Sequence, residues 1–284
     1  MVRPGFEITA EPPVEPTGNV RRVIEISEKY LSTILIDLTT QKLISLRNYS
    51  LLQTPDATPV QEIMDILNNE DESIDFQYTA RVIYNYTESA LLPSQLYSSQ
   101  LEAPLTRVVF GDAERGATRT DTIPEMNIEH IYRVARDVNM HLEQRFPQAE
   151  HRHIYSQMIP LCISGAEVDN ETDVIKVEFY SDRFILLIFR NNDLKAINTY
   201  LYQTPEDVVY YMLGLCQKLE VDPAAAVTHI SGLIDVQSPL FTELNKYFAR
   251  VIPEALPEPI RQQQLVNEYP DHYFANLMNL ALCE

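Results

Sequence analysis

Two histidines, His151 and His153, are the residues of this chain whose types and spacing come nearest to a metal site. Alternate positions on a strand point to the same face, so both imidazoles could bind one zinc ion. No cysteine lies near them in the sequence to extend the ligand set. Exposed histidines at a junction between a strand and a helix are the simpler interpretation, and we predict no metal site and no cofactor.

Polar residues near the ends of predicted strands are the other candidates: Glu25, Ser27 and Asp37 in the first half, and Ser231 with Gly232 in the second. Sequence motifs with an established chemistry are missing. We find no Gly-x-Ser-x-Gly nucleophile, no phosphate loop and no paired-cysteine motif. The chain has seven glycines, which limits the backbone turns that could enclose a phosphate. From these residues we predict no catalytic group.

Composition sets the broad class of protein. The chain has 284 residues, 45% of them hydrophobic and 22% charged, which suits a folded protein of two domains. Its formal charge of −19 repels phosphate backbones and anionic lipids, so we expect a protein partner and no nucleic acid. No apolar run approaches the length of a membrane span, and we expect no direct membrane insertion.

The cysteines and the N-terminal residues indicate the compartment. Cys162, Cys216 and Cys283 are far apart, odd in number and placed in apolar runs, which is typical of reduced core thiols. The first residues match neither a signal peptide nor a transit peptide. We therefore expect a cytoplasmic protein.

A repeat gives the strongest indication of fold. The tripeptide Gln53-Thr54-Pro55 recurs as Gln203-Thr204-Pro205. Laid without gaps around it, the two stretches also pair Tyr30 with Tyr180, and their apolar residues coincide. The repeat predicts an internal duplication.

Each copy contains the same order of predicted elements. In both, three β segments are followed by a helix with a Thr-Pro start and then by a strand. The first copy has strands at 23–27, 32–38 and 42–52, a helix at 59–68 capped by Thr58, and a strand at 81–84. The second has strands at 174–180, 184–190 and 194–202, a helix from 204 to 219, and a strand at 227–230.

Other segments surround the copies. Residues 1–19 are rich in proline and carboxylates, and we predict a disordered or extended arm. Between the copies we expect a hairpin of strands 105–110 and 117–123, a strand at 128–134, and helices at 137–146 and 153–163. After the second copy we expect helices at 239–251 and 273–282.

A duplicated β-β-β-α-β unit resembles the actin-like ATPase superfamily, whose halves have the ribonuclease-H-like fold. The stretch from Asn198 to Tyr211 and the ending from Tyr273 to Glu284 resemble a bacterial family called domain of unknown function 3822. The resemblance implies an α/β actin-like fold, with domain I at 20–165, domain II at 166–270 and a C-terminal helix, 271–284, packing on domain I. It implies no established activity.

In catalytic members of that superfamily, the first hairpin of each half binds phosphate through an Asp-x-Gly turn. The first hairpin here has Glu25 for the acid but Ser27 in place of glycine, followed by Glu28. The second hairpin reads Ile175-Lys176-Val177-Glu178-Phe179-Tyr180-Ser181, with Lys176 in place of the acid and no glycine. Ser231-Gly232 corresponds to a turn that contacts adenosine in some members, although a simple turn is the plainer interpretation.

Four tyrosines, Tyr200, Tyr202, Tyr210 and Tyr211, could form a peptide-binding face or cover the edge of the core. Three functions stay open at this point. The chain could be a non-catalytic actin-like scaffold or regulatory partner with a degenerate nucleotide site. It could instead be a divergent ATP-dependent kinase or ATPase using Glu25 and Asp37. Thirdly, it could be a cytoplasmic platform of a membrane assembly complex.

Overall fold

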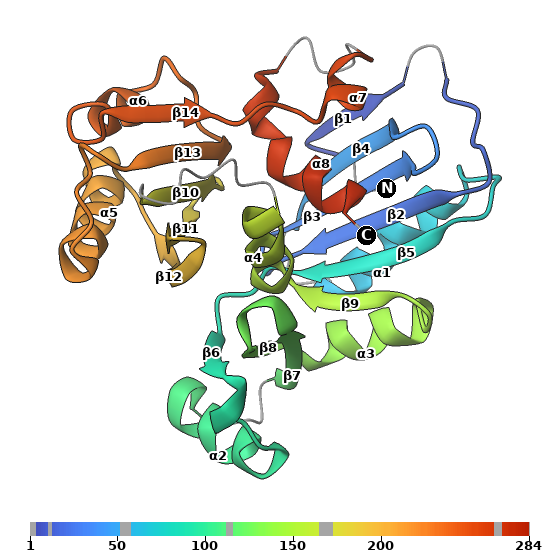
Figure 1. Cartoon of the computed structure of the whole chain (residues 1–284). Coiled ribbons are helices and arrows are strands. Elements are labelled where there is room, and N and C mark those ends of the chain that lie inside the picture. The colour runs from blue at the N-terminus through green and yellow to red at the C-terminus, as the bar shows by residue number, and fades with distance from the viewer. Residues whose placement is uncertain are drawn as a thin grey trace. The chain divides into compact units, whose positions relative to one another are not determined.

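The computed structural model describes residues 4–10, 13–51, 58–111, 116–164, 173–263 and 269–283. The chain divides into two compact units, Met1–Gln157 and Met158–Cys283, and the division falls inside α4 (Ile154–Ser164) (Figure 1). Among the described residues, no helix combines the length and the apolar character needed to span a membrane. The domain limits expected from the sequence stay predictions.

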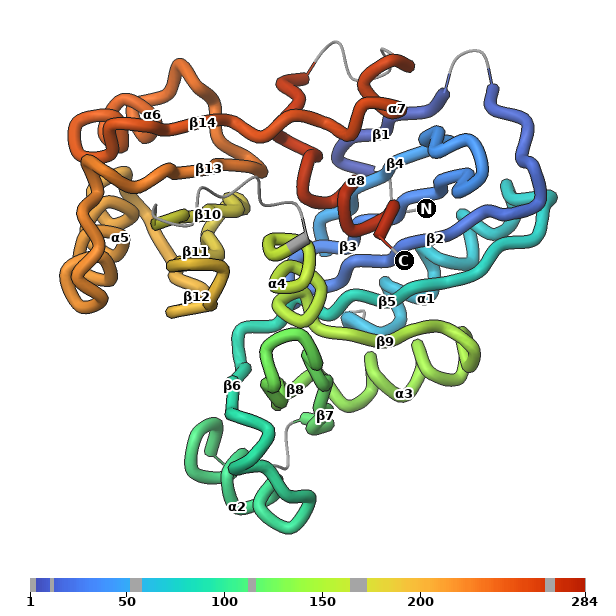
Figure 2. Tube along the Cα trace, viewed as in Figure 1, coloured from blue at the N-terminus to red at the C-terminus, as the bar shows by residue number. Residues whose placement is uncertain are grey.

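A six-stranded sheet of order β1-β4-β3-β2-β5-β9 forms the base of the first unit. β2, β3 and β4 are antiparallel neighbours, whereas β5 and β9 run parallel to β2. The strands are β1 (Phe6–Thr9), β2 (Val20–Ile26), β3 (Tyr30–Asp37), β4 (Lys42–Ser50), β5 (Thr79–Tyr84) and β9 (Glu150–His153). Figure 2 follows the chain from β5 through a long insertion and back to β9.

Two helices, α1 (Pro59–Asp71) and α3 (Arg136–Arg145), bury their apolar residues in the core of this sheet. The start of α1 confirms the predicted capping box. Thr58 Oγ1 accepts a hydrogen bond from the Gln61 N–H at 3.3 Å, and Gln61 Oε1 accepts one from the Thr58 N–H at 3.1 Å. These bonds satisfy donors that the first turn of a helix otherwise leaves without partners.

The insertion contains a three-stranded sheet of order β6-β8-β7 and the helix α2 (Ser99–Phe110). Its strands are β6 (Ser89–Pro93), β7 (Gly116–Ile123) and β8 (Ile128–Ala135), with one-turn helices η1 (Ser94–Leu96) and η3 (Pro124–Met126). The predicted hairpin between 105–110 and 117–123 is wrong, because residues 105–110 belong to α2 and β7 pairs with β8. Over so short an apolar run, strand and helix periods cannot be told apart.

The second unit contains a five-stranded sheet of order β12-β11-β10-β13-β14. Its strands are β10 (Val174–Phe179), β11 (Arg183–Arg190), β12 (Asp193–Leu201), β13 (Val227–Gly232) and β14 (Arg250–Pro253). Its helices are α5 (Pro205–Leu219), α6 (Pro239–Leu244), α7 (Glu258–Arg261), η4 (Asp271–Tyr273) and α8 (Ala275–Leu282). The helix predicted at 239–251 is wrong in its second part, where β14 begins.

Strands β4-β3-β2-β5-β9 of the first unit and β12-β11-β10-β13-β14 of the second have the same order and the same directions. Even a β-bulge recurs. Ile44 is the extra residue in β4, and Lys195 is the extra residue at the matching place in β12. An internal duplication would produce this agreement in strand order, strand direction and bulge position, and the duplication itself stays a hypothesis.

The gap-free alignment of the two copies is wrong in register. The Ser27 N–H donates to the Tyr30 carbonyl at 3.0 Å, and the Tyr180 N–H donates to the Arg183 carbonyl at 2.8 Å. These bonds close equivalent hairpins, so Tyr30 corresponds to Arg183 and not to Tyr180. The tripeptide that suggested the alignment begins at Gln53, which lies outside the described residues.

The two Thr-Pro helix starts are equivalent in structure. Thr204 caps α5 by accepting from the Asp207 N–H at 3.3 Å, as Thr58 does for α1. The counterpart of Thr204-Pro205 is therefore Thr58-Pro59.

Of the two alternatives predicted for the arm at 1–19, disordered or extended, the disordered one is wrong for Phe6–Thr9, which form the extended strand β1 against β4. Ile8 is buried beside Leu46, and Glu7 Oε1 accepts from Arg47 Nε at 2.7 Å. One buried isoleucine and the backbone ladder offset the ordering entropy that the proline-rich composition suggested. The C-terminal helix is confirmed as α8, which contacts β13; its packing on domain I stays a prediction.

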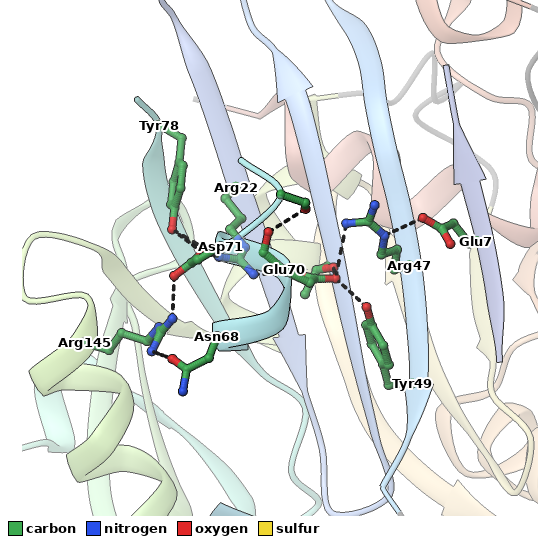
Figure 3. A network of polar contacts seen from close by, with 11 residues as sticks. Glu7, Arg22, Arg47, Tyr49, Asn68, Glu70, Asp71, Tyr78 and Arg145 are labelled. Atoms are coloured by element: carbon green, nitrogen blue, oxygen red, sulfur yellow. Dashed lines mark hydrogen bonds and ion pairs between the residues drawn. The ribbon is translucent and has the colours of Figure 1, made fainter. Parts of the chain in front are cut away.

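A buried cation, Arg22 on β2, connects the sheet of the first unit to α1. Its Nη2 lies 2.5 Å from Glu70 Oε2, and its Nη1 contacts Asp71 (Figure 3). Glu70 Oε1 also accepts from Thr33 Oγ1 at 2.6 Å and from the Tyr49 hydroxyl at 2.8 Å. Arg22 is fully buried, so its charge depends on these partners in place of water.

The outer part of the same network reaches α3. Arg145 on α3 contacts Asp71, and its Nη1 donates to Asn68 Oδ1 at 2.6 Å. The Tyr78 hydroxyl donates to Asp71 Oδ1 at 3.0 Å. The last turn of α1 is thereby bonded both to the sheet and to the neighbouring helix α3.

We expect Arg22→Ala to lower the free energy of unfolding by about 3–5 kcal/mol, because it leaves the buried Glu70 with only the more distant cation Arg47, whose Nη1 is 3.8 Å from Glu70 Oε1. The matched control is Arg152→Ala in the same unit, whose partner Glu150 lies 2.7 Å away with both side chains more than a third exposed. That control should lose at most about 1 kcal/mol. Urea denaturation followed by circular dichroism measures both, and equal losses would contradict this view of the network.

Candidate functional site

The turn of the first hairpin uses its own backbone donors. Ser27 follows β2 and is 1% exposed. Its Oγ accepts from the N–H groups of Lys29 and Tyr30, each at 3.1 Å. In a phosphate-binding turn such successive N–H groups point at the ligand. Here two such N–H groups donate to the Ser27 side chain of the same turn.

Glu25, the acid of this hairpin, is 3% exposed and is held by neutral donors. Its Oε1 accepts from the Tyr30 hydroxyl at 2.9 Å and from Asn85 Nδ2 at 2.7 Å. The Asn85 N–H donates to the Ile26 carbonyl at 2.8 Å, which fixes Asn85 at the end of β5. The carboxylate therefore has protein partners, as buried polar groups require.

The second hairpin has an acid as well, which the sequence analysis placed wrongly. In the register of the sheets, Glu178 on β10 is the counterpart of Glu25, because it lies opposite Ser231 as Glu25 lies opposite Ile83. Glu178 is 5% exposed, and its Oε2 accepts a hydrogen bond from Ser231 Oγ. Both hairpins thus carry a buried glutamate one residue before the end of the strand.

Lys176, predicted to replace the acid, has another role. Its Nζ lies 3.0 Å from Glu254 Oε1. Burial disfavours the charged amine, but the nearby Cys162 and Glu254 outweigh burial and raise the pKa of Lys176. Lys176 is a structural cation of the second unit and does not stand at the hairpin.

Gly232 ends β13 where the backbone passes close to Phe179. Its φ is +80°, and a Cβ at this position would lie 2.1 Å from the Phe179 carbonyl oxygen. The next N–H, that of Leu233, donates to the same carbonyl at 2.8 Å. This close approach explains the glycine by backbone geometry alone. Its predicted contact with a nucleotide stays a prediction.

Asp37 lies at the opposite end of β3 from the hairpin, roughly 20 Å from Tyr30 at about 3.3 Å per residue. It accepts from the Thr17 N–H at 2.7 Å and from the N–H groups of Thr39 and Thr40 at 3.0 and 2.9 Å. Burial opposes its ionisation, but the bonds from Thr17 and Thr40 outweigh burial and lower the pKa of Asp37 to about 2. Asp37 therefore organises the β3–β4 turn and does not join Glu25 in one site.

Neither candidate zinc ligand is exposed. His151 Nδ1 lies 3.0 Å from the Tyr84 hydroxyl, and its Nε2 lies 3.2 Å from the Phe146 carbonyl oxygen. His153 Nε2 lies 2.8 Å from the Tyr86 carbonyl oxygen, and its Nδ1 accepts from the Tyr155 N–H at 3.1 Å. All four ring nitrogens thus have protein partners, and the exposed-histidine interpretation is wrong. Within the described part of the chain, no cluster of three or more metal-ligating side chains occurs.

The sequence analysis missed three residues of the hairpins: Tyr30, Asn85 and Glu178. The signal for Glu178 was present, because Ile24-Glu25-Ile26 and Val177-Glu178-Phe179 share an apolar-Glu-apolar pattern. Aligning the copies on these glutamates, rather than on the tripeptide, gives the structural register. Tyr30 and Asn85 carry no such signal, because their roles depend on the pairing of β2 with β3 and β5.

These two sheets and their hairpins define a protein with the actin-like ATPase fold. A Bacteroides thetaiotaomicron protein with that fold and of unknown function aligns with a TM-score of 0.77 at 15% identity, covering 94% of this chain and 97% of that one. A chain of the PilM–PilN type IV pilus biogenesis complex aligns with a TM-score of 0.58 at 11% identity, covering 95% and 98%. No curated protein matches. The chain belongs to the family described as protein of unknown function (DUF3822), whose sequence model matches residues 18–251.

We expect Gly232→Ala to destabilise the second unit by at least about 2 kcal/mol, because it adds both a strained φ and a clash with backbone. Gly214→Ala is the matched control, since a Cβ there meets nothing within 4 Å and the residue lies inside α5. The control should gain about 0.5–1 kcal/mol. Thermal unfolding of both variants tests this, and a neutral Gly232→Ala would show that the backbone can move away.

Proposed function

We propose that this chain is a non-catalytic actin-like protein that acts as a scaffold or regulatory partner, with a degenerate nucleotide site. The observation that carries the proposal is the Ser27 side chain, whose Oγ lies 3.1 Å from both the Lys29 and Tyr30 nitrogens. A nucleotide phosphate would have to displace that oxygen to reach the same donors. The proposal includes a cytoplasmic location and an origin by internal duplication.

Electrostatics supports the same proposal. Glu28 lies in the turn of the first hairpin, and the chain as a whole carries a charge of −19. A carboxylate about 4 Å from a phosphate costs about 1 kcal/mol in water and about 4 kcal/mol at an effective dielectric of 20. The exposed Lys29 beside Glu28 compensates part of this repulsion, so the turn donors already used by Ser27 are the stronger argument.

The divergent ATPase alternative would require Glu25 to hold a hydrated metal ion. Glu25 would have to give up its bonds with the Tyr30 hydroxyl and Asn85, which are 2.9 and 2.7 Å long. Removing a partner from a buried polar group costs about 1–3 kcal/mol for each group left without one. The non-catalytic proposal needs no such rearrangement.

Exposed apolar residues on the insertion favour a role in protein binding. Leu101, Val108 and Val109 of α2 are 52%, 84% and 51% exposed, and Leu96 just before the helix is 66% exposed. Apolar side chains gathered in one segment of a surface are typical of interaction sites. The platform hypothesis is a second candidate on this ground, and the PilM–PilN complex shows a protein of similar fold in an assembly with a partner.

We expect no stabilisation of the full chain by ATP, ADP or GTP with magnesium in a thermal-shift assay, and no binding heat in isothermal titration. Ligand at about a hundredfold over its dissociation constant would add roughly 2.7 kcal/mol and raise the melting temperature measurably. Glu25→Ala is the control variant. Micromolar binding that Glu25→Ala abolishes would overturn the proposal and restore the ATPase alternative.

A further inference from the structure

One edge of the two large sheets differs in length from their other three edges. The two large sheets end at β1 and β9 in the first unit and at β12 and β14 in the second. β1, β9 and β14 have four residues each, whereas β12 has nine. Proteins usually keep edge strands short, because a long edge offers a row of backbone donors and acceptors to another chain. The length of β12 therefore points to a binding edge.

The first unit contains an example of a strand that pairs with an equivalent edge. β4 is the counterpart of β12, since Leu46 lies opposite Ile34 as Ile197 lies opposite Leu187. The outer side of β4 is covered by β1, an antiparallel strand of the same chain. The ladder extends past β1 itself, with the Ala10 N–H donating to the carbonyl of the bulge residue Ile44 at 3.0 Å.

The matching side of β12 has no strand beside it among the described residues. Lys195 takes the place of Ile44, and Ile197 takes the place of Leu46. The Tyr202 N–H donates inward to the Asp182 carbonyl at 3.1 Å, and backbone groups alternate along a strand. The N–H groups of Ile197 and Leu201, which lie on the same side of the bulge as Tyr202, are therefore on the outer side of β12.

Tyrosines lie beside this edge, where the sequence left a core role and a peptide-binding role open. Tyr200 of β12 stacks on Tyr211 of α5 with ring centroids 4.6 Å apart, and both are partly buried against the core. Tyr210 meets the Tyr211 ring edge-on at 5.5 Å and is 73% exposed. The group thus packs on the core and still presents one open ring face next to β12.

Charge decides the kind of partner. On β1, Glu7 pairs with Arg47 at 2.7 Å, but the counterpart of Arg47 on β12 is Asn198. A glutamate at that place would find no arginine opposite it, and Lys195 on the same strand already contacts Asp193 at 3.5 Å, whereas a lysine or arginine would meet the tyrosine rings, which attract cations. The net charge of −19 also sets two copies of this chain against each other.

We propose that β12 receives an extended, basic segment of a partner protein as an added antiparallel strand. An apolar residue of that segment lies beside Ile197, as Ile8 lies beside Leu46, and a lysine or arginine next to it faces Tyr200 and Tyr210. Backbone bonds provide the affinity, and the side chains provide the selectivity. This inference rests on the proposed function, because it names the partner that a non-catalytic scaffold would hold.

The probe is a fluorescein-labelled octapeptide of alternating valine and lysine, titrated into the full chain and followed by anisotropy. A control peptide carries proline at a central valine, so it keeps the charge but cannot form the ladder. We expect binding by the first peptide only. Amide hydrogen exchange measured by NMR should slow at least about tenfold at Ile197 and Leu201 when the peptide is bound.

Two variants at Leu201 distinguish the contribution of its backbone N–H to peptide binding from that of its side chain. Leu201→Pro removes an outward N–H and should weaken binding roughly tenfold, whereas Leu201→Ala keeps that donor and should bind within about twofold of the parent. Tyr210→Ala leaves the strand intact and should weaken the lysine peptide about two- to fivefold. Circular dichroism of each variant establishes that it is folded.

Equal binding of the proline peptide, protection at other amides, or no effect of Leu201→Pro in a folded variant would overturn the inference. A dimer with the amides of Ile197 and Leu201 protected before peptide is added would also overturn it, in favour of a second copy as occupant. A parallel Mg-ATP thermal shift separates this inference from the proposed function. If neither the peptide binds nor ATP shifts the melting temperature, only the strand-partner inference is wrong. If ATP shifts the melting temperature and the shift depends on Glu25, only the non-catalytic function is wrong.

Discussion

The fold of the first unit depends on the neutralisation of one buried cation. Arg22 is fully buried in β2, and the carboxylates that balance it, Glu70 and Asp71, come from the last turn of α1. Negative charge is unfavourable at that end of a helix. The two acids also contact other cations, Arg145 at Asp71 and Arg47 at Glu70. Among the described residues, Arg22 forms ion pairs only with these acids, so the pairing holds α1 on the sheet. Glu25 lies three residues further along the same strand, and its position at the hairpin follows from this attachment.

The two units share one strand architecture and differ in the residues around it. Both have the same strand order, the same bulge and a buried glutamate before the hairpin, as Glu25 and Glu178 show. They differ in what surrounds these shared parts. In the first unit a serine fills its own hairpin turn and β1 covers the edge of β4. In the second unit Ser231 bonds with the glutamate, and the long strand β12 lies at the edge of the sheet.

Local chemistry was predictable from the sequence, whereas long-range pairing was not. Thr58 with Gln61 gave the start of α1 correctly, because a capping box involves only neighbours along the chain. Residues 105–110 were misassigned, because six residues do not distinguish the two periods. Glu178 was missed because the gap-free alignment ignored differences in turn and loop length between the copies. The bonds that satisfy Glu25 could not be predicted, since Asn85 reaches it only through the pairing of β5 with β2.

The central claim is that the hairpin donors are already used within the protein. The most direct test is an NMR titration of the full chain that follows the backbone amides of Lys29 and Tyr30 while Mg-ATP is added. If Ser27 Oγ holds both amides, they exchange slowly with solvent and their chemical shifts do not move on addition of the nucleotide. Exchange at both amides should become faster in Ser27→Ala, which lacks the acceptor oxygen. Saturable shifts centred on these two amides in the parent protein would contradict the account, because they would show that a phosphate can take the place of the serine oxygen.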